Sequence, residues 1–193
     1  MRTRLHRHAR RIKVIVYQET LFNFKEHFWT FLGAFAGIGL IGWLNSFRLP
    51  TDTPLLIASF GASSVLVYGA INSPLAQPRN LLGGHVLSAF IGVTVQHWVP
   101  QELWLASALA VSLSIVGMQI TKTLHPPGGA TALIAVIGSP QLKALGYGYV
   151  FLPVLTGAAM LLVVALIFNN TTASRHYPTN KRWYRFWQRV YHE

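Results

Sequence analysis

The sequence predicts an all-α, polytopic membrane protein, and three observations lead to that fold class. Of 193 residues, 52% are hydrophobic and only 11% are charged, whereas soluble domains average roughly 25% charged residues. Two short apolar segments are interrupted by glycine or proline. Four longer stretches of about 19 to 23 residues can each cross roughly 30 Å of hydrocarbon: Phe28–Pro50, Leu81–Val99, Leu103–Thr121 and Gly146–Phe168.

Positive charge is concentrated at the two ends of the chain. The formal net charge is +11; seven of the 16 Lys and Arg lie within residues 1–25, and five lie between Arg175 and Arg189. Lys and Arg resist translocation and favour anionic headgroups. Both termini are therefore expected in the cytoplasm, with anionic lipid rather than nucleic acid as their partner.

Cysteine is missing from the sequence, and acidic residues are few. Without cysteine there are no disulfides, thiolate nucleophiles or sulfur-ligated metals. We therefore expect no metal, no cofactor and no catalytic residues. The five acids all lie in tails or turns, which argues against a cation pathway or a carboxylate-based hydrolase: Glu19, Glu26, Asp52, Glu102 and Glu193.

Residues 1–27 form the first of three expected regions. Six basic residues precede an apolar run, which predicts a basic amphipathic segment on the inner membrane surface; a disordered basic tail is the alternative. The first long stretch follows in the transmembrane region, residues 28–169. Its glycines form a thin flank that suits a neighbouring helix or a second protomer: Gly33, Gly37, Gly39 and Gly42.

The segment Leu55–Ile71 is too short for an ordinary span. LLIASF at its start reads as extended or buried chain, and a short helix is expected to open at Gly61-Ala62-Ser63-Ser64. A loop with two prolines follows at residues 73–80 and carries Arg79 and Asn80.

The stretch KTLHPPGGATALIAVIG, residues 122–138, contains a second short segment. Pro126 and Pro127 lack amide donors and restrict the residue before each of them, so a helix can start here but cannot pass through. We expect the helix to begin at about Gly128. It then has only about 17 Å of length and cannot span a membrane alone.

Residues 170–193 form the third expected region. Aromatic side chains recur at helical spacing in KRWYRFWQRVYHE, residues 181–193, with three arginines among them. This pattern predicts an amphipathic helix at the membrane interface. A basic, aromatic tail that binds nucleic acid is the alternative.

The two short segments align with each other. Residues 61–66 lie over residues 129–134, and Ser73-Pro74 lies over Ser139-Pro140 with a two-residue gap. In the spans that follow, Gly92 then aligns with Gly157. The matches are mostly small residues, which membrane helices favour in any case, so a chance alignment is the alternative.

A repeat of long span, broken short helix and long span has three crossings, so the second copy must be inverted. Six crossings then leave both termini inside, as the charge distribution requires. Counting only the four long stretches gives the same result. Inverted repeats around interrupted helices are typical of transporters and channels.

Three motifs resemble the HPP family of integral membrane proteins, named for its His-Pro-Pro motif: HPPGGATAL at 125–133, GASSVLV at 61–67 and SPLAQPRNLLGGH at 73–85. The resemblance covers roughly residues 28–169. It implies a compact helical membrane domain, usually described as four-spanning, from which six crossings would depart. Plastid relatives are associated with nitrite transport, so the resemblance implies movement of nitrite or a similar small anion.

The proposed anion site lies at the starts of the two short helices. Their free backbone N–H groups would supply partial positive charge, and three hydroxyls would add hydrogen bonds. Close helix packing is the alternative role for these small residues. The candidates are Gly61, Ala62, Ser63, Ser64, Gly128, Gly129, Ala130 and Thr131.

Four further residues complete the candidate site. Arg79 is a fixed charge near membrane depth, or else a topology signal at the membrane edge, and Asn80 orders its loop. His85 and His125 titrate near neutral pH and are candidates for proton coupling. Either histidine could instead be structural.

The sequence thus predicts a transporter or channel for a small monovalent anion in a bacterial inner membrane, with a plastid envelope as the alternative. A membrane scaffold acting through the basic termini is the second hypothesis. A membrane enzyme acting on lipid phosphate through Arg79, His85 and His125 is the third.

Overall fold

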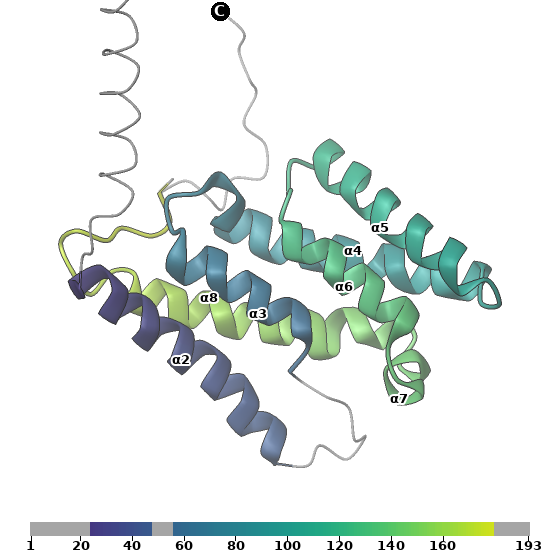
Figure 1. The fold of residues 1–193 in the computed structure, drawn as a ribbon, viewed down its shortest axis with the longest axis horizontal. Coiled ribbons are helices and arrows are strands. Elements are labelled where there is room, and N and C mark those ends of the chain that lie inside the picture. The colour runs from purple at the N-terminus through teal and green to yellow at the C-terminus, as the bar shows by residue number, and fades with distance from the viewer. Residues whose placement is uncertain (1–23, 48–55, 180–193) are drawn as a thin grey trace, which may run out of the picture.

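The computed structural model describes residues 24–47 and 56–179, and all the regular structure in these residues is helical (Figure 1). The long helices are α2 (Phe24–Ser46), α4 (Pro78–Trp98), α5 (Leu103–Ile120) and α8 (Thr156–Phe168). The π-helical turns Val150–Leu155 (η3) extend α8 at its start. The short helices are α3 (Ala58–Ser64), continued by the π-helical turn Val65–Gly69 (η1), and α6 (Pro126–Ile137). The all-helical fold is confirmed.

Three helical stretches in the described residues are long and apolar enough to cross a membrane: Phe24–Ser46, Leu103–Ile120 and Val150–Phe168. The fourth expected span, α4, has 21 residues and is long enough, but it is more polar. It carries Arg79, Asn80 and His85. Since α5, α6, η3 and α8 all contact it, its polar groups meet protein.

The prediction that the first short helix opens at Gly61 is wrong. α3 already begins at Ala58, with Ile57 in extended conformation before it. Ala58, Ser59 and Phe60 include no helix breaker, so the apolar run that reads as extended chain joins the helix. Gly61 therefore lies in the middle of α3.

The second short helix begins two residues earlier than expected, at Pro126 rather than Gly128. Proline is well suited to a first helical turn, because the N–H that it lacks would have had no partner within the helix. The prediction that no helix passes through this point is confirmed, since α5 ends at Ile120.

Glycines let α4 and α6 pack closely side by side. A Cβ at Gly84 would lie 2.6 Å from the His125 Cβ, and one at Gly92 would lie 2.6 Å from the Ala132 carbonyl oxygen. A Cβ at Gly128 would lie 2.8 Å from the Ser88 Oγ. Successive contacts advance in the same direction along both helices, so α4 and α6 are parallel.

A second group of helices comprises α2 and α8, on the opposite side of the bundle from α5, and α3 contacts both of them as well as α6 (Figure 1). The buried Tyr68 fills the space beside Gly33 and Gly37 of α2 and donates a hydrogen bond to the Leu161 carbonyl, 3.0 Å away. The outer face of α2 exposes large aromatic side chains, as a lipid-facing helix does: Phe31, Phe35 and Trp43.

Residues 169–179 form turns and bends rather than the start of an interfacial helix. They pack against the bundle: Asn169 donates to the Val67 carbonyl, and Tyr177 donates to the Ala76 carbonyl. Burial raises the pKa of Tyr177, so this phenol stays a donor. The expected helix at 181–193 and the amphipathic segment up to residue 23 lie outside the described residues.

Candidate functional site

A line of buried polar side chains joins α3, α4 and α6. The Ser63 Oγ lies 2.7 Å from the His85 Nε2 and 2.9 Å from the His125 Nε2. The His85 Nδ1 lies 2.7 Å from the Thr131 Oγ1, and the His125 Nδ1 lies 2.8 Å from the Leu75 carbonyl oxygen. Ser63, His85, His125 and Thr131 each have 0% of their surface exposed.

The local structure determines where the two imidazoles lie. His125 is the N-cap of α6 with extended dihedral angles, the conformation that a residue before proline prefers. His85 follows Gly84, whose lack of a side chain admits the His125 Cβ. The two rings consequently meet edge to face, with centroids 5.0 Å apart.

Two groups in this site were missed at the sequence level. The Ser59 Oγ accepts a hydrogen bond from the Thr131 Oγ1 at 2.9 Å. Ser59 stands four residues before Ser63, which places it on the same helix face, but the expected extended chain hid that relation. The second is the Leu75 carbonyl oxygen, which no side-chain pattern indicates.

The expected cradle of free amides is absent from both short helices. Residues 61–64 lie in the second half of α3, where N–H groups bond within the helix. In α6 the first two residues are prolines, and the Gly128 N–H donates to the His125 carbonyl at 2.8 Å. The first turn of α6 therefore has no spare donor for an anion.

The remaining small residues have diverse positions. Gly61 and Ala62 are exposed on the outer face of α3, and Gly129 and Ala130 are partly buried. Gly128 is buried and serves the contact of α6 with α4. The alternative role of close packing thus holds at Gly128, while Gly61 has open space around it.

Some buried hydroxyls lack a partner. Ser64 and Ser88 are 6% and 0% exposed, and neither Oγ has a hydrogen-bond partner among the described residues. Ser64 is adjacent in sequence to Ser63, and Ser88 is one helical turn after His85. A buried polar atom without a partner calls for a ligand or water.

Arg79 and Asn80 hold the turn that precedes α6. The Arg79 Nη2 donates to the Thr121 carbonyl at 2.8 Å, and the Asn80 Nδ2 donates to the Leu124 carbonyl at 2.7 Å. Arg79 also lines a largely apolar groove of about 610 Å³ between α4 and η3. It contacts neither histidine, so the structure does not assemble the three residues of the proposed lipid-phosphate enzyme.

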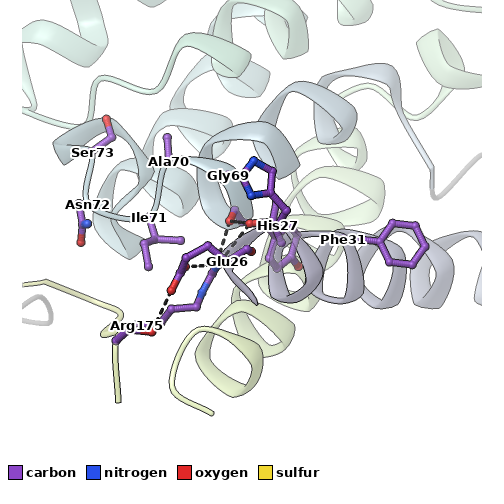
Figure 2. Close-up of a pocket in the computed structure, with 12 residues that line it drawn as sticks. Glu26, His27, Phe31, Gly69, Ala70, Ile71, Asn72, Ser73 and Arg175 are labelled. Carbon is purple, nitrogen blue, oxygen red and sulfur yellow. Dashed lines mark hydrogen bonds and ion pairs between the residues drawn. The ribbon is translucent and has the colours of Figure 1, made fainter. Parts of the chain in front are cut away.

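A second pocket, of about 850 Å³, lies between the start of α2, residues 68–73 and the segment after α8 (Figure 2). Arg175 forms one wall, with 2% of its surface exposed. Its Nη1 lies 3.0 Å from the Glu26 Oε2, and its Nη2 donates to the Tyr68 carbonyl and the Asn169 Oδ1, each at 2.8 Å. The sequence predicts for Arg175 only a place among the basic residues of the C-terminal region.

The site can exchange protons and hydrogen bonds, but it does not resemble a metal site. In the described part of the chain, no three His, Cys, Asp or Glu side chains come together to hold a metal ion. Two imidazoles and three hydroxyls, from Ser59, Ser63 and Thr131, provide both donors and acceptors.

Comparison with known proteins identifies this architecture. The family model described as "HPP, transmembrane region" matches residues 19–178, which extends beyond the expected 28–169 at both ends. Two transmembrane proteins of Dictyostelium discoideum are similar to the chain. One is 44% identical over 160 residues, which cover 81% of this chain and 51% of the relative. The other is 45% identical over 161 residues, covering 81% and 56%.

The chain thus spans about half the length of the relatives that it matches. No solved structure matches it significantly. The comparisons confirm the predicted family resemblance and the membrane location. Their names do not specify a substrate, and the predicted bacterial membrane stays a prediction.

Proposed function

Because the chain belongs to the family of HPP transmembrane proteins, we propose that it carries a small monovalent anion of the nitrite class across a membrane. The observation that carries this proposal is the buried polar line from Thr131 to His125 inside an apolar bundle. Ionisable groups at membrane depth are costly and usually functional. The anion class comes from the family resemblance.

The anion's partners differ from those that the sequence suggests. In place of helix amides, the spare hydroxyls of Ser64 and Ser88 donate to the anion, because every ring nitrogen of the two histidines already has a partner. Nitrite is planar and has two equivalent oxygens, which suits several weak donors rather than one strong charge. Weak donors also allow release.

We propose further that residues 24–98 and 103–168 form an inverted repeat. Ser63 and Thr131, which the sequence alignment pairs, contact the two ring nitrogens of the same histidine, His85. Each hydroxyl oxygen also lies near the carbonyl oxygen four residues earlier, 3.2 Å from that of Ser59 and 3.3 Å from that of Pro127. Equivalent positions thus make equivalent bonds.

The paired glycines support the same proposal. Gly92 of α4 packs against Ala132 of α6, and Gly157 of α8 packs against Phe60 of α3. In each case a long helix of one half packs on the short helix of the other half. This exchange of partners is what a two-fold axis in the membrane plane produces.

The positive charges favour one orientation in the membrane. Lys25, Arg79, Lys122 and Arg175 lie at or just beyond helix ends that meet at one end of the bundle, whereas Lys143 lies near the other. By the positive-inside rule, the end of the bundle that carries these four residues faces the cytoplasm. The start of α2 and the segment after α8 both lie at that end (Figure 1).

A flux measurement tests the proposed function. Purified protein in liposomes is expected to admit nitrite faster than protein-free vesicles do, and faster than nitrate, formate, chloride or bicarbonate. The double variant Ser64→Ala, Ser88→Ala is expected to lower this flux. Ser114→Ala, which removes a buried, unpartnered hydroxyl on α5, is the matched control. The proposal would be refuted if the protein raised the flux of none of the five anions above that of protein-free vesicles.

The two other hypotheses have less support. The scaffold hypothesis depends on basic termini that lie mostly outside the described residues. The enzyme hypothesis needs Arg79 beside His85 and His125, whereas Arg79 reaches the Thr121 carbonyl instead. We therefore propose a protein without enzymatic activity.

A further inference from the structure

We propose that the anion crosses together with one proton, which passes along the polar line Thr131–His85–Ser63–His125 and is held by His125. This inference rests on the proposed transport function and names its coupling ion. It depends on the order of hydrogen bonds in the line, which the geometry determines.

The line has a single direction when both histidines are neutral. A carbonyl oxygen can only accept, so the His125 Nδ1 carries a proton and donates it to Leu75. The His125 Nε2 is then an acceptor, and the Ser63 hydroxyl must donate to it. Ser63 has no second proton.

The same reasoning continues to the other end of the line. Because the Ser63 proton is directed at His125, the bond of 2.7 Å between Ser63 and His85 needs a proton on the His85 Nε2. A neutral His85 then accepts at its Nδ1, and the Thr131 hydroxyl donates there. Every bond between Thr131 and Leu75 therefore runs the same way.

A proton added at Thr131 reverses the line by short transfers. Thr131 gives its hydroxyl proton to the His85 Nδ1 and receives one from a hydronium ion on the entry side, which becomes water. His85 gives its Nε2 proton to Ser63, which gives its own to the His125 Nε2. One proton has entered, and His125 has become an imidazolium ion that donates from both nitrogens.

The reversed line is also fully bonded. Ser63 now accepts from His125 and donates to the His85 Nε2, while His85 donates from its Nδ1 to Thr131. Thr131 directs its hydroxyl proton to the Ser59 Oγ at 2.9 Å. The Ser59 Oγ is thus the acceptor that Thr131 needs once His85 donates to it.

Among the described residues, no fixed charge lies beside the line to balance an imidazolium ion. The groups facing it are Ser59, Ser63 and the Phe60 ring from α3, Thr131 from α6, and the Leu75 carbonyl. Tyr149 directs its hydroxyl at the Thr131 carbonyl. Of the acids in the described residues, Glu26 pairs with Arg175, and Glu102 precedes α5.

A buried charge without a counter-ion is strongly unfavourable. The proton and the anion therefore stabilise each other's presence, and each binds poorly alone. This mutual dependence couples the two fluxes in a ratio of one to one and makes the transport step electrically neutral.

The test uses the full-length protein in liposomes that contain a pH-sensitive dye, with nitrite added outside. We expect one proton to enter per nitrite, and no response of the rate to a potassium diffusion potential. An inward proton gradient of one pH unit should raise the initial rate by up to about tenfold. Protein-free vesicles give the leak of undissociated nitrous acid, which is subtracted.

Variants locate the proton path. Ser63→Ala and Thr131→Val each interrupt the line and should remove the response to the proton gradient, whereas Ser63→Thr and Thr131→Ser keep a hydroxyl and should restore it. Ser114→Ala should behave as the unaltered protein. Size-exclusion chromatography shows whether each variant elutes as a monodisperse species. Where Ser63→Ala or Thr131→Val aggregates, proton coupling is judged from Ser63→Thr or Thr131→Ser instead.

The two proposals fail in different ways. Nitrite entry that carries current and ignores the proton gradient would overturn proton coupling but leave anion transport standing. Proton coupling that survives in both Ser63→Ala and Thr131→Val would overturn this path. If Ser63→Thr and Thr131→Ser fold but lose proton coupling, proton transfer through these hydroxyls would be refuted. Absence of nitrite flux would overturn the function itself.

Discussion

The two short helices carry matching sequences but are held in place differently. α6 is fixed along its length, because Gly84, Gly92 and Gly128 let it lie directly against α4. α3 exposes Gly61 and Ala62 on its outer face and loosens into the π-helical turn η1. Besides the contacts of Phe60 and Ser63 with α8 and the histidines, α3 is held at the end of that turn, where side chains from other segments bind.

The turn η1 leaves backbone carbonyl groups that need donors from elsewhere. Asn169 donates to the Val67 carbonyl, and both Thr30 and Arg175 donate to the Tyr68 carbonyl. π-helical turns often occur at functional sites. The difference teaches that α6 is positioned by its contacts along α4, whereas α3 depends in part on the segment after α8.

The largest effect should come from removing that hold. Arg175→Met removes the ion pair with the partly exposed Glu26 and the guanidinium bonds to the Tyr68 carbonyl and the Asn169 Oδ1, and each hydrogen bond to a charged group contributes about 1.5–3 kcal/mol. The melting temperature in detergent, measured by tryptophan fluorescence, should fall by at least about 6 °C. Arg79→Met, which loses one bond to the Thr121 carbonyl, is the control and should lose roughly 1 kcal/mol. Equal losses would mean that α3 is not held from this end.

The next effect concerns the contact of α6 with α4. Gly84→Ala places a Cβ 2.6 Å from that of His125 and 2.8 Å from the Thr123 carbonyl oxygen, so α6 must move away. Overpacking of this kind costs about 1–3 kcal/mol, measurable as a lower unfolding midpoint. An unchanged midpoint would show that α6 is as adaptable as α3.

A smaller difference should separate the paired hydroxyls. Ser63 serves two imidazoles, whereas Thr131 serves one. Each buried group left unpaired costs about 1–3 kcal/mol, so Ser63→Ala should lower the free energy of unfolding more than Thr131→Val does. The reverse order, measured by denaturant titration in the same detergent, would argue against the central place of Ser63.

The smallest effects should come from the outer glycines. A Cβ at Gly61 meets nothing within 4 Å, and one at Gly129 meets only the Val111 Cγ1, at 3.8 Å. Gly61→Ala and Gly129→Ala should therefore be neutral or stabilise their helices by up to about 1 kcal/mol. Gly128→Ala should destabilise α6, because its Cβ would lie 2.8 Å from the Ser88 Oγ. A loss at Gly61 would reveal a partner on that face.

The sequence predicts the sections of the fold that hydropathy and proline govern. The extent of α5 and the start of a short helix at the two prolines follow from run length and missing amides. The start of α3 was misjudged because an apolar run of six residues suits a strand or a helix equally well. In the folded protein, tertiary contacts favour the helix at the start of α3.

Four of the candidate side chains meet in the structure, and their role in binding an anion stays a prediction. Ser63, His85, His125 and Thr131 do meet, whereas the amides at Gly61 and Gly128 are already bonded within their helices. Composition does not reveal that the Leu75 carbonyl orients His125, or that Arg175 binds the end of η1. Both are contacts between segments far apart in sequence, which a single chain read alone does not encode as a pattern.

Three of the four bonds in the polar line connect residues of the first half with residues of the second: Ser63 with His125, His85 with Thr131, and Leu75 with His125. A sliding of one half past the other by even 1 Å would stretch three contacts at once beyond hydrogen-bonding distance. The line is therefore complete only while the two halves keep their present positions. If it carries protons as proposed, a rearrangement that opened the bundle to the opposite compartment would also disconnect it and leave a delivered proton on His125.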